Sequence, residues 1–280
     1  MPNDSENWFN SPLGQWLLEE ELVRSRQLIP AGYYPTALQV GMPNMSYLCD
    51  LKDVEVGTRF VTTPDIARIP DAATGCKGED SESSSRLMVA RAGALPFGER
   101  THSLIVMPHV LDFSEDPHRV LREVNQVLIP EGCIVITGFN HISLWGLKSL
   151  VPQRLRRDPQ QAPWAGQHYR ARRVQDWLSL LGIDIVGACM FAYQPHLQRE
   201  SWRARMGFLD RMGERWWPGL GAAYMIVGRK REFASGRTVS RLAWRRFIPA
   251  IARPGMTAAG ISSAAGARRA QLRLVVKNSF

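Results

Sequence analysis

One segment, Leu104–Phe139, restricts the fold more than any other part of this 280-residue chain. It begins with Leu104–Met107, which is apolar at every position, as in a strand that is covered on both faces. Ser114–Leu128 then has the apolar spacing of an amphipathic helix, with Asp116 as a good N-cap, and Cys133–Phe139 is a second apolar strand. A strand, a helix and a strand in this order predict a parallel βαβ unit.

The rest of the chain alternates strands and helices in the same way. Helices are expected from Ser11 to about Gln27 and over 172–181, and the further expected strands are Thr36–Val40, Val56–Thr63, Leu87–Ala90, Ile183–Met190 and Ala222–Val227. After Arg231 the apolar periodicity ends, and Ala, Gly, Ser and Arg dominate. We therefore expect one α/β domain over residues 1–231, with a helical insertion at about 196–220, and a disordered basic tail over 232–280.

The charge of the chain is concentrated near its carboxyl end. The net charge is +9, but residues 229–280 hold twelve of the 35 Lys and Arg residues and only one of the 26 acids. The other 228 residues are therefore close to neutral, and they do not have the uniformly basic composition of a nucleic-acid-binding domain.

The cysteines and the amino-terminal sequence indicate the cellular compartment in which the protein is expected. Cys49, Cys76, Cys133 and Cys189 are scattered and lack the paired spacing of a metal site, so we expect free thiols and no metal. The first 21 residues lack the basic and apolar regions of a signal peptide, and no apolar stretch is long enough to span a membrane. These features predict a cytoplasmic protein.

Four parts of the chain resemble the second half of class I S-adenosylmethionine-dependent methyltransferases. They are Leu-Pro-Phe at 95–97, the apolar strand at 104–107, Leu-Arg-Glu at 121–123 and Pro-Glu-Gly at 130–132. The chain looks most like the small-molecule branch, methyltransferase type 11, and within it like an uncharacterised bacterial subfamily. This implies a Rossmann-like, doubly wound sheet of seven mostly parallel strands with an antiparallel last strand, here Ala222–Val227.

The resemblance further implies S-adenosyl-L-methionine as the cofactor and a small molecule as the substrate. Several positions match the family's cofactor contacts, in the loop after the first strand, after the second strand, before the Leu-Pro-Phe turn and in the fourth strand. These positions are Gly41, Met42, Asn44, Asp65, Ala92, Gly93 and Met107.

The sequence departs from the family at several polar positions. Gly41 alone remains of the family's glycine-rich loop, Pro43 removes an amide donor from it, and Gln39 replaces the usual acid. Ser103 stands where an acid is expected at the start of the fourth strand. These changes leave two functions open: an active methyltransferase, and a non-catalytic binding protein of the same fold.

The best single candidate for a general base or substrate contact is His109. It follows the strand at 104–107, where ligands bind in open α/β sheets, and imidazole titrates near neutral pH. Equally open is a structural role in the loop to the next helix.

Other residues are weaker candidates for contacts with the substrate. Asn140 and His141 end the next strand at the same edge, although Asn is also common in turns. An aromatic pocket or core packing would explain a further set, Trp145, Trp164, Tyr169, Trp216 and Trp217. In a non-catalytic protein, residues 232–280 would contact RNA, a membrane or a protein.

Overall fold

The computed structural model describes residues 8–42, 47–49, 51, 54–64, 85–149, 166–195 and 205–231. All of them belong to one compact unit, Met1–Ala250. The predicted tail, residues 232–280, lies outside the described residues, so its expected disorder remains a prediction.

Seven strands form one mixed sheet in the order β3-β2-β1-β4-β5-β7-β6. Strands β1 to β5 run parallel to one another, and β7 runs antiparallel to both β5 and β6. This arrangement confirms the predicted doubly wound sheet with an antiparallel last strand. The strands are β1 (Gly32–Val40), β2 (Val54–Thr63), β3 (Ser85–Val89), β4 (His102–Pro108), β5 (Leu128–Phe139), β6 (Ile183–Phe191) and β7 (Ala223–Lys230).

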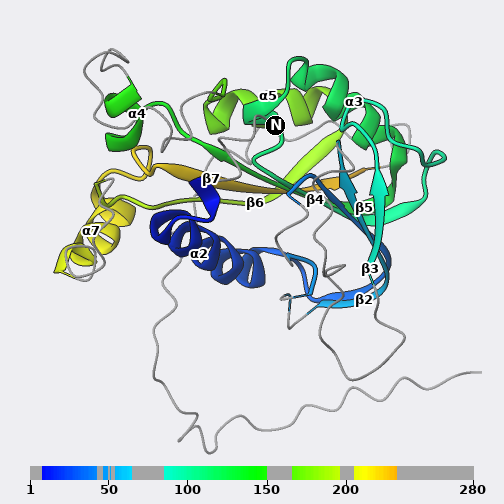
Figure 1. Cartoon of the computed structure of the whole chain (residues 1–280), viewed down its shortest axis with the longest axis horizontal. Coiled ribbons are helices and arrows are strands. Elements are labelled where there is room, and N and C mark those ends of the chain that lie inside the picture. The colour runs from blue at the N-terminus through cyan, green and yellow to red at the C-terminus, as the bar shows by residue number, and fades with distance from the viewer. Residues whose placement is uncertain are drawn as a thin grey trace, which may run out of the picture. The chain divides into compact units, whose positions relative to one another are not determined.

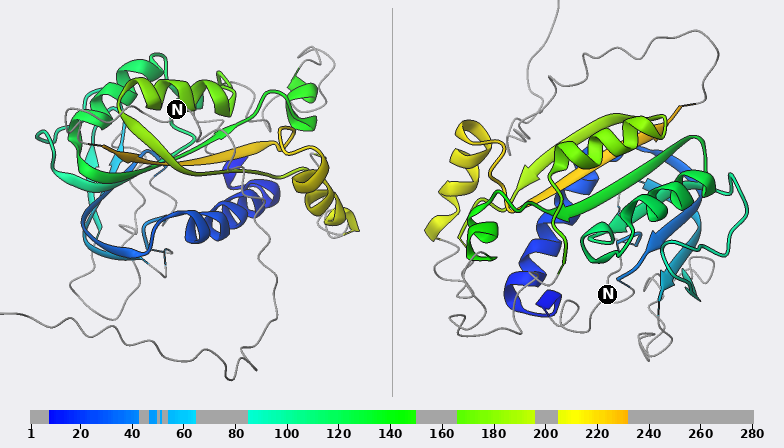
Figure 2. Two further views of the ribbon diagram at one scale, coloured as in Figure 1. Left: turned by 180° about the vertical axis from the view of Figure 1, so that it is seen from behind. Right: turned by 90° about the horizontal axis from the view of Figure 1, so that it is seen from above.

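The helices lie on both faces of this sheet (Figures 1 and 2). Helix α2 covers one face, and α3 and α5 cover the other. None of the helices in the described ranges is long and apolar enough to cross a bilayer. The helices are α2 (Pro12–Leu28), η2 (Leu111–Phe113), α3 (Pro117–Val127), α4 (Leu144–Ser149), α5 (Ala171–Leu180) and α7 (Phe208–Trp216).

Two helices, α2 and α3, begin at the capping residues that the sequence predicts. The Ser11 hydroxyl accepts a hydrogen bond from the Gly14 amide, at 3.2 Å, and Pro12 fills the first position of α2. The Asp116 carboxylate accepts the Arg119 amide, at 2.9 Å, at the start of α3. Both starts agree with the sequence-based expectation, because each cap satisfies an amide that the first turn leaves unpaired.

The apolar core consists of two clusters, one on each face of the sheet. In β5, Val135 belongs to the cluster under α2, whereas Ile134 and Ile136 belong to the cluster under α3 and α5. Alternation follows from the two-residue period of a strand. All seven residues of β4 are buried, as its apolar sequence predicts for a strand covered on both sides.

Strand β5 begins earlier than the sequence suggests. The predicted turn at 130–132 lies within the strand, whose first residue, Leu128, also ends α3 by donating its amide to the Val124 carbonyl. Glu131 adopts a left-handed φ of 60°, and the pairing with β4 shifts register between His102 and Leu104. The chain therefore passes from helix to strand through an irregularity in the sheet.

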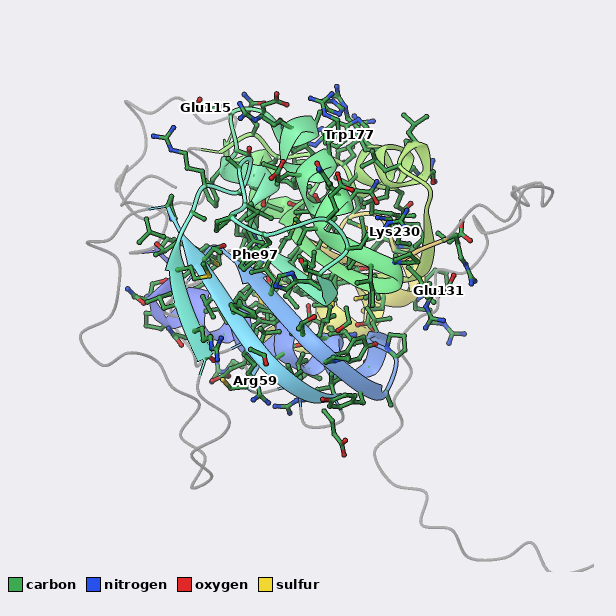
Figure 3. The ribbon with its side chains drawn as sticks, turned by 90° about the vertical axis from the view of Figure 1, so that its right-hand side faces the viewer. Arg59, Phe97, Glu115, Glu131, Trp177 and Lys230 are labelled. Carbon is green, nitrogen blue, oxygen red and sulfur yellow. The ribbon has the colours of Figure 1, made fainter. Side chains whose placement is uncertain are left out.

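The far end of β7 is tied to β5 and α3 (Figure 3). The Lys230 ammonium donates to the carbonyls of Asn125, at 2.5 Å, and Leu128, at 2.8 Å. Arg231 pairs with Glu131 at 3.0 Å and with Asp184 at 3.2 Å. These contacts hold the last residues of the described fold in place.

The cysteines agree with the expectation only in part. Cys133 and Cys189 are free and buried, as predicted. Cys49 is disulfide-bonded, so the prediction of a free thiol is wrong at this position. Scattered spacing in a sequence says little about which cysteines the fold brings together.

Candidate functional site

The carboxyl ends of β1, β4 and β5 meet at one edge of the sheet. Gln39 pairs with Val106, and Pro108 with Thr137, so the residues that follow these three strands leave the sheet side by side. The strand order also reverses between β1 and β4. In open α/β sheets, this reversal point is where ligands bind.

The turn after β1 has a left-handed backbone at two successive residues. Gly41 has φ of 75° and Met42 has φ of 49°. The Gly41 amide donates to the Thr62 carbonyl at 2.9 Å, and the Gln39 amide nitrogen donates to the carbonyls of Gly41, at 3.3 Å, and Met42, at 2.8 Å. Gln39, which stands where the family has an acid, therefore fixes the shape of the turn from within the protein.

Few atoms of the described residues lie beside Gly41. A Cβ atom built on Gly41 would meet, among the described residues, only Cγ2 of Val110, at 3.4 Å. The Met42 side chain is buried in the cluster under α2, whereas Val110 belongs to the cluster on the other face. The bulk of Met42 is thus directed into the core, and the backbone at Gly41 and Val110 fits the approach of a cofactor.

His109 lies at the same edge but is completely buried in a polar cluster. Its Nε2 is 2.6 Å from Oε1 of Glu21, on α2, and its Nδ1 is 3.1 Å from Oδ2 of Asp112, on η2. Tyr47 and Thr137 donate their hydroxyls to Oε2 of Glu21, at 2.7 and 3.4 Å. The cluster therefore joins the amino-terminal helix to the segment that follows β4.

The surroundings of His109 favour its protonated form. Burial lowers the pKa of His109, but the charge of Glu21 and the hydrogen bonds to Asp112 and Glu21 outweigh it and raise the pKa to about 9. The rings of Phe9 and Phe139 lie 5.0 and 4.2 Å from the imidazole ring. At neutral pH, His109 is thus an imidazolium between two carboxylates.

The ring of His109 is fully engaged by its neighbours. Both ring nitrogens are engaged by carboxylates, and none of the side chain reaches solvent. An imidazole held in this way has no free nitrogen with which to accept a proton from a substrate. Its amide donates to the Thr137 carbonyl at 3.1 Å, and its φ is 52°, so the cluster holds a left-handed residue directly before Val110.

The expected substrate residues Asn140, His141 and Trp145 have different surroundings. The buried Asn140 amide nitrogen donates to the carbonyls of Ile142, Gly219 and Gly221, at 3.0–3.1 Å. Trp145 is buried too, and its Nε1 donates to the Gln194 carbonyl at 2.7 Å. Only His141 is exposed, where Arg170 donates to its Nε2 at 3.3 Å.

The other expected cofactor residues are only partly described. Ala92 and Gly93 form a turn closed by the Ala94 amide, which donates to the Arg91 carbonyl, and Arg119 of α3 donates to the Gly93 carbonyl at 3.0 Å. Met107 is completely buried, with 0% of the residue exposed. Asn44, Asp65 and Trp164 lie outside the described residues.

Sequence reasoning missed Glu21, Tyr47, Asp112 and Thr137. A signal was available for Glu21, since it follows Leu17 by four residues and so lies on the buried face of α2. Glu21 is hard to single out because it is the last of three consecutive glutamates at 19–21, and such a run is ordinary on a surface helix. Among the described residues, no group of three or more His, Cys, Asp or Glu side chains could hold a metal ion.

Comparison with known proteins gives a family match in the central part of the chain. Residues 38–136, from β1 to β5, match the family described as "Methyltransferase domain". An Escherichia coli K12 protein, the uncharacterised YafS, is 38% identical over 137 residues, which are 49% of this chain and 52% of YafS. The chain thus matches about half the length of this curated relative.

Solved structures share the fold at low sequence identity. A SAM-dependent methyltransferase of Thermotoga maritima has a TM-score of 0.58 at 15% identity, covering 82% of this chain and 95% of its own. One from Mesorhizobium loti has 0.54 at 16%, covering 76% and 100%. The N-methyltransferase NodS of Bradyrhizobium japonicum, solved with S-adenosyl-L-homocysteine, has 0.52 at 15%, covering 79% and 89%.

Proposed function

We propose that this chain, which has the class I methyltransferase-like fold and whose residues 38–136 match a methyltransferase domain, is an S-adenosylmethionine-dependent methyltransferase acting on a small molecule. The observation that carries the proposal is the turn at Gly41. Its left-handed backbone faces Val110 at the point where the strand order reverses, and only one described atom would contact an added Cβ. The complex of NodS with S-adenosyl-L-homocysteine supports the same cofactor here.

The residues proposed to hold the cofactor act mainly through their backbone. The peptides of Gly41 and Met42 would line its amino-acid part, and the turn at Ala92 and Gly93 would lie near its base. Asn44 and Asp65 are proposed from the family resemblance alone. When bound, S-adenosylmethionine supplies an electrophilic methyl group, and the protein's own task is to align the acceptor and exclude water.

His109 and Glu21 would act in this site by positioning. The cluster that contains them holds the backbone of Val110 against the turn at Gly41. Of the three expected substrate residues, we propose His141 as the one that contacts the acceptor, because Asn140 and Trp145 are buried and His141 is exposed.

Calorimetry with S-adenosyl-L-homocysteine tests the proposal. Wild-type protein should bind it, and Gly41→Ala should weaken binding by about tenfold or more, because the new methyl group would face the gap to Val110. Gly182→Ala is the matched control, since Gly182 has the same left-handed φ, 76°, in the turn between α5 and β6. Both variants carry similar backbone strain, but only the first alters the proposed site.

A folded protein that releases no heat with the ligand would overturn the proposal. It would favour the alternative, a non-catalytic binding protein whose residues 232–280 contact RNA, a membrane or a protein. Equal binding by wild type and Gly41→Ala would instead move the cofactor site away from this turn.

We propose a cytoplasmic location, because Cys133 and Cys189 are free thiols, as expected in a reducing compartment. The disulfide at Cys49 counts against it, because disulfides are rare in reducing compartments. Alkylation of protein taken directly from cells, followed by mass spectrometry, decides the question. A free Cys49 thiol would support the cytoplasm, and an oxidised one would reject it.

A further inference from the structure

Helix α7 presents its large apolar side chains to solvent. Phe208, Met212 and Trp216 are 50%, 41% and 68% exposed, and their spacing of four residues places them on one face of the helix. In the turn that follows, Trp217 and Leu220 are 54% and 43% exposed. We call these five residues the α7 surface.

The opposite face of α7 attaches to the protein through polar contacts. Asp210 accepts the Tyr193 amide at 2.8 Å and the Gln194 amide nitrogen at 2.5 Å, and Glu214 pairs with Arg24 of α2 at 2.7 Å. Gly213 packs so closely on the Tyr193 ring that a Cβ atom would clash with it. The orientation of α7 is therefore fixed, and it is the reverse of a usual surface helix, whose apolar face points to the core.

The α7 surface lies beside the candidate site. Asn140, at the end of β5, donates to the carbonyls of Gly219 and Gly221, next to Leu220, and also to that of Ile142. Ile142 is itself 39% exposed. In Figure 1, α7 and α4 are found at the end of the sheet where β5 finishes. An apolar surface of this kind on a protein is a mark of an interaction site.

The charges around the α7 surface select its partner. Arg205 and Arg215 are exposed on this helical segment, whereas its two acids, Asp210 and Glu214, point inward and are hydrogen-bonded. The outward face is thus apolar and cationic. A second copy of the chain would place like charges in one interface, which opposes a symmetric dimer.

We propose that the α7 surface docks on the anionic face of a phospholipid bilayer. Trp216 and Trp217 suit the boundary between headgroups and acyl chains, where amphipathic aromatic rings concentrate. Phe208 and Met212 enter the same boundary, while Arg205 and Arg215 meet lipid phosphates. The polar contacts of Asp210 and Glu214 keep the apolar face of the helix turned away from the protein. This inference does not depend on the proposed methyltransferase activity.

Vesicle flotation of the full-length protein tests the proposal. Wild type should float with vesicles of phosphatidylglycerol and phosphatidylcholine and bind pure phosphatidylcholine vesicles more weakly. Replacing Phe208, Met212 and Trp216 by Gln should reduce the bound fraction about tenfold or more, because apolar area leaves the interface. The matched control replaces three exposed apolar residues elsewhere by Gln and should bind as wild type; these are Tyr33, Val89 and Leu180, which are 64%, 50% and 85% exposed.

A second variant tests the charge separately. Arg205→Glu/Arg215→Glu should lose binding to the anionic vesicles while the apolar residues remain. Wild type that fails to bind anionic vesicles overturns the proposal, and so does a triple variant that binds like wild type, which would assign the membrane contact to residues 232–280. The proposal also fails if wild type does not bind vesicles but forms a dimer that the triple variant does not form. The α7 surface would then be a contact between two copies of the chain.

Discussion

At the scale of single residues, the Glu21–His109–Asp112 cluster shows how a buried charge is tolerated. One imidazolium lies between two carboxylates, and each of its N–H groups has an acceptor. Asp112 also accepts the Phe139 amide at 2.9 Å, which ties the cluster to the end of β5. Removing one partner from such a group leaves an uncompensated buried charge, so its members should be sensitive to substitution.

Protonation of His109 should make stability depend on pH. Its pKa is about 9 in the folded protein and about 6.5 in the unfolded chain, so its contribution is complete below pH 6.5 and is lost as pH rises through 9. The free energy of unfolding in urea should therefore fall by about 1.2 kcal/mol between pH 7 and 8. Burial raises the pKa of Cys133 and Cys189 to about 12, so their thiols add to this fall only at higher pH.

Two histidine variants separate this contribution from the background. His109→Gln should abolish the slope between pH 7 and 8. His102→Gln should keep it, because burial lowers the pKa of His102 to about 4 and leaves that side chain neutral throughout the window. An unchanged slope in His109→Gln would contradict the charged state assigned to this imidazole.

Glu21 can be compared with its neighbour on the same helix. Glu21→Gln should reduce the free energy of unfolding by about 3 kcal/mol, since it leaves the buried imidazolium with one partner. Glu20→Gln should reduce the free energy of unfolding by less than about 1 kcal/mol. Glu20 is partly exposed, and its ion pair with Arg24 is long, at 3.6 Å. Urea denaturation measures both free energies. Equal losses would mean that the buried pair of Glu21 and His109 stabilises the fold no more than an exposed ion pair does.

At the scale of elements, helix α3 holds the turn beside the proposed cofactor site. Arg119 donates to the Gly93 carbonyl, and Glu123 accepts the Leu95 amide at 3.1 Å. The start of the helix, fixed by Asp116, therefore sets the position of the segment that precedes β4. A substitution that loosens the start of α3 should therefore also disturb the turn at Ala92 and Gly93.

The Asp116 cap can be tested against its exposed neighbour. Asp116→Ala should lower the free energy of unfolding by about 1 kcal/mol, because it removes the acceptor of the Arg119 amide. Glu115→Ala, one position earlier, should change it by less than about 0.5 kcal/mol. Chemical denaturation at neutral pH measures the two, and a cost for Glu115→Ala as large as that for Asp116→Ala would argue against the cap.

At the scale of the molecule, the seven strands end at Lys230, well before the carboxyl terminus. Lys230 and Arg231 are held by carbonyls and acids of α3, β5 and β6, so contacts among the described residues already fix the end of the last strand. A chain that ends at Arg231 should unfold with a midpoint within about 2 °C of the full protein. Thermal denaturation followed by circular dichroism measures this, and a much larger drop would show that residues 232–280 support the fold.

The fold could be predicted because the sequence features that specify it lie within short segments of the chain. The apolar run of β4, the stripe of α3 and the caps at Ser11 and Asp116 each act within a few residues, and the structure confirms them. The candidate site was predicted less well, because its contacts are distant in sequence. His109 was identified, but its partner Glu21 lies 88 residues earlier, and spacing alone cannot show that the two meet.

The pairing of Glu21 with distant strands has a consequence for synthesis. Helix α2 is made first, yet Thr137, which donates to Glu21, lies 116 residues later. At about 5–20 residues per second, a ribosome needs roughly 6–23 seconds to add that length of chain. Tyr47 and His109 are added earlier, 26 and 88 residues after Glu21, so the carboxylate lacks its full set of partners until Thr137 is added. Burying it before then would be costly. The amino-terminal helix should therefore stay hydrated on the nascent chain and dock only after β4 and β5 have left the ribosome.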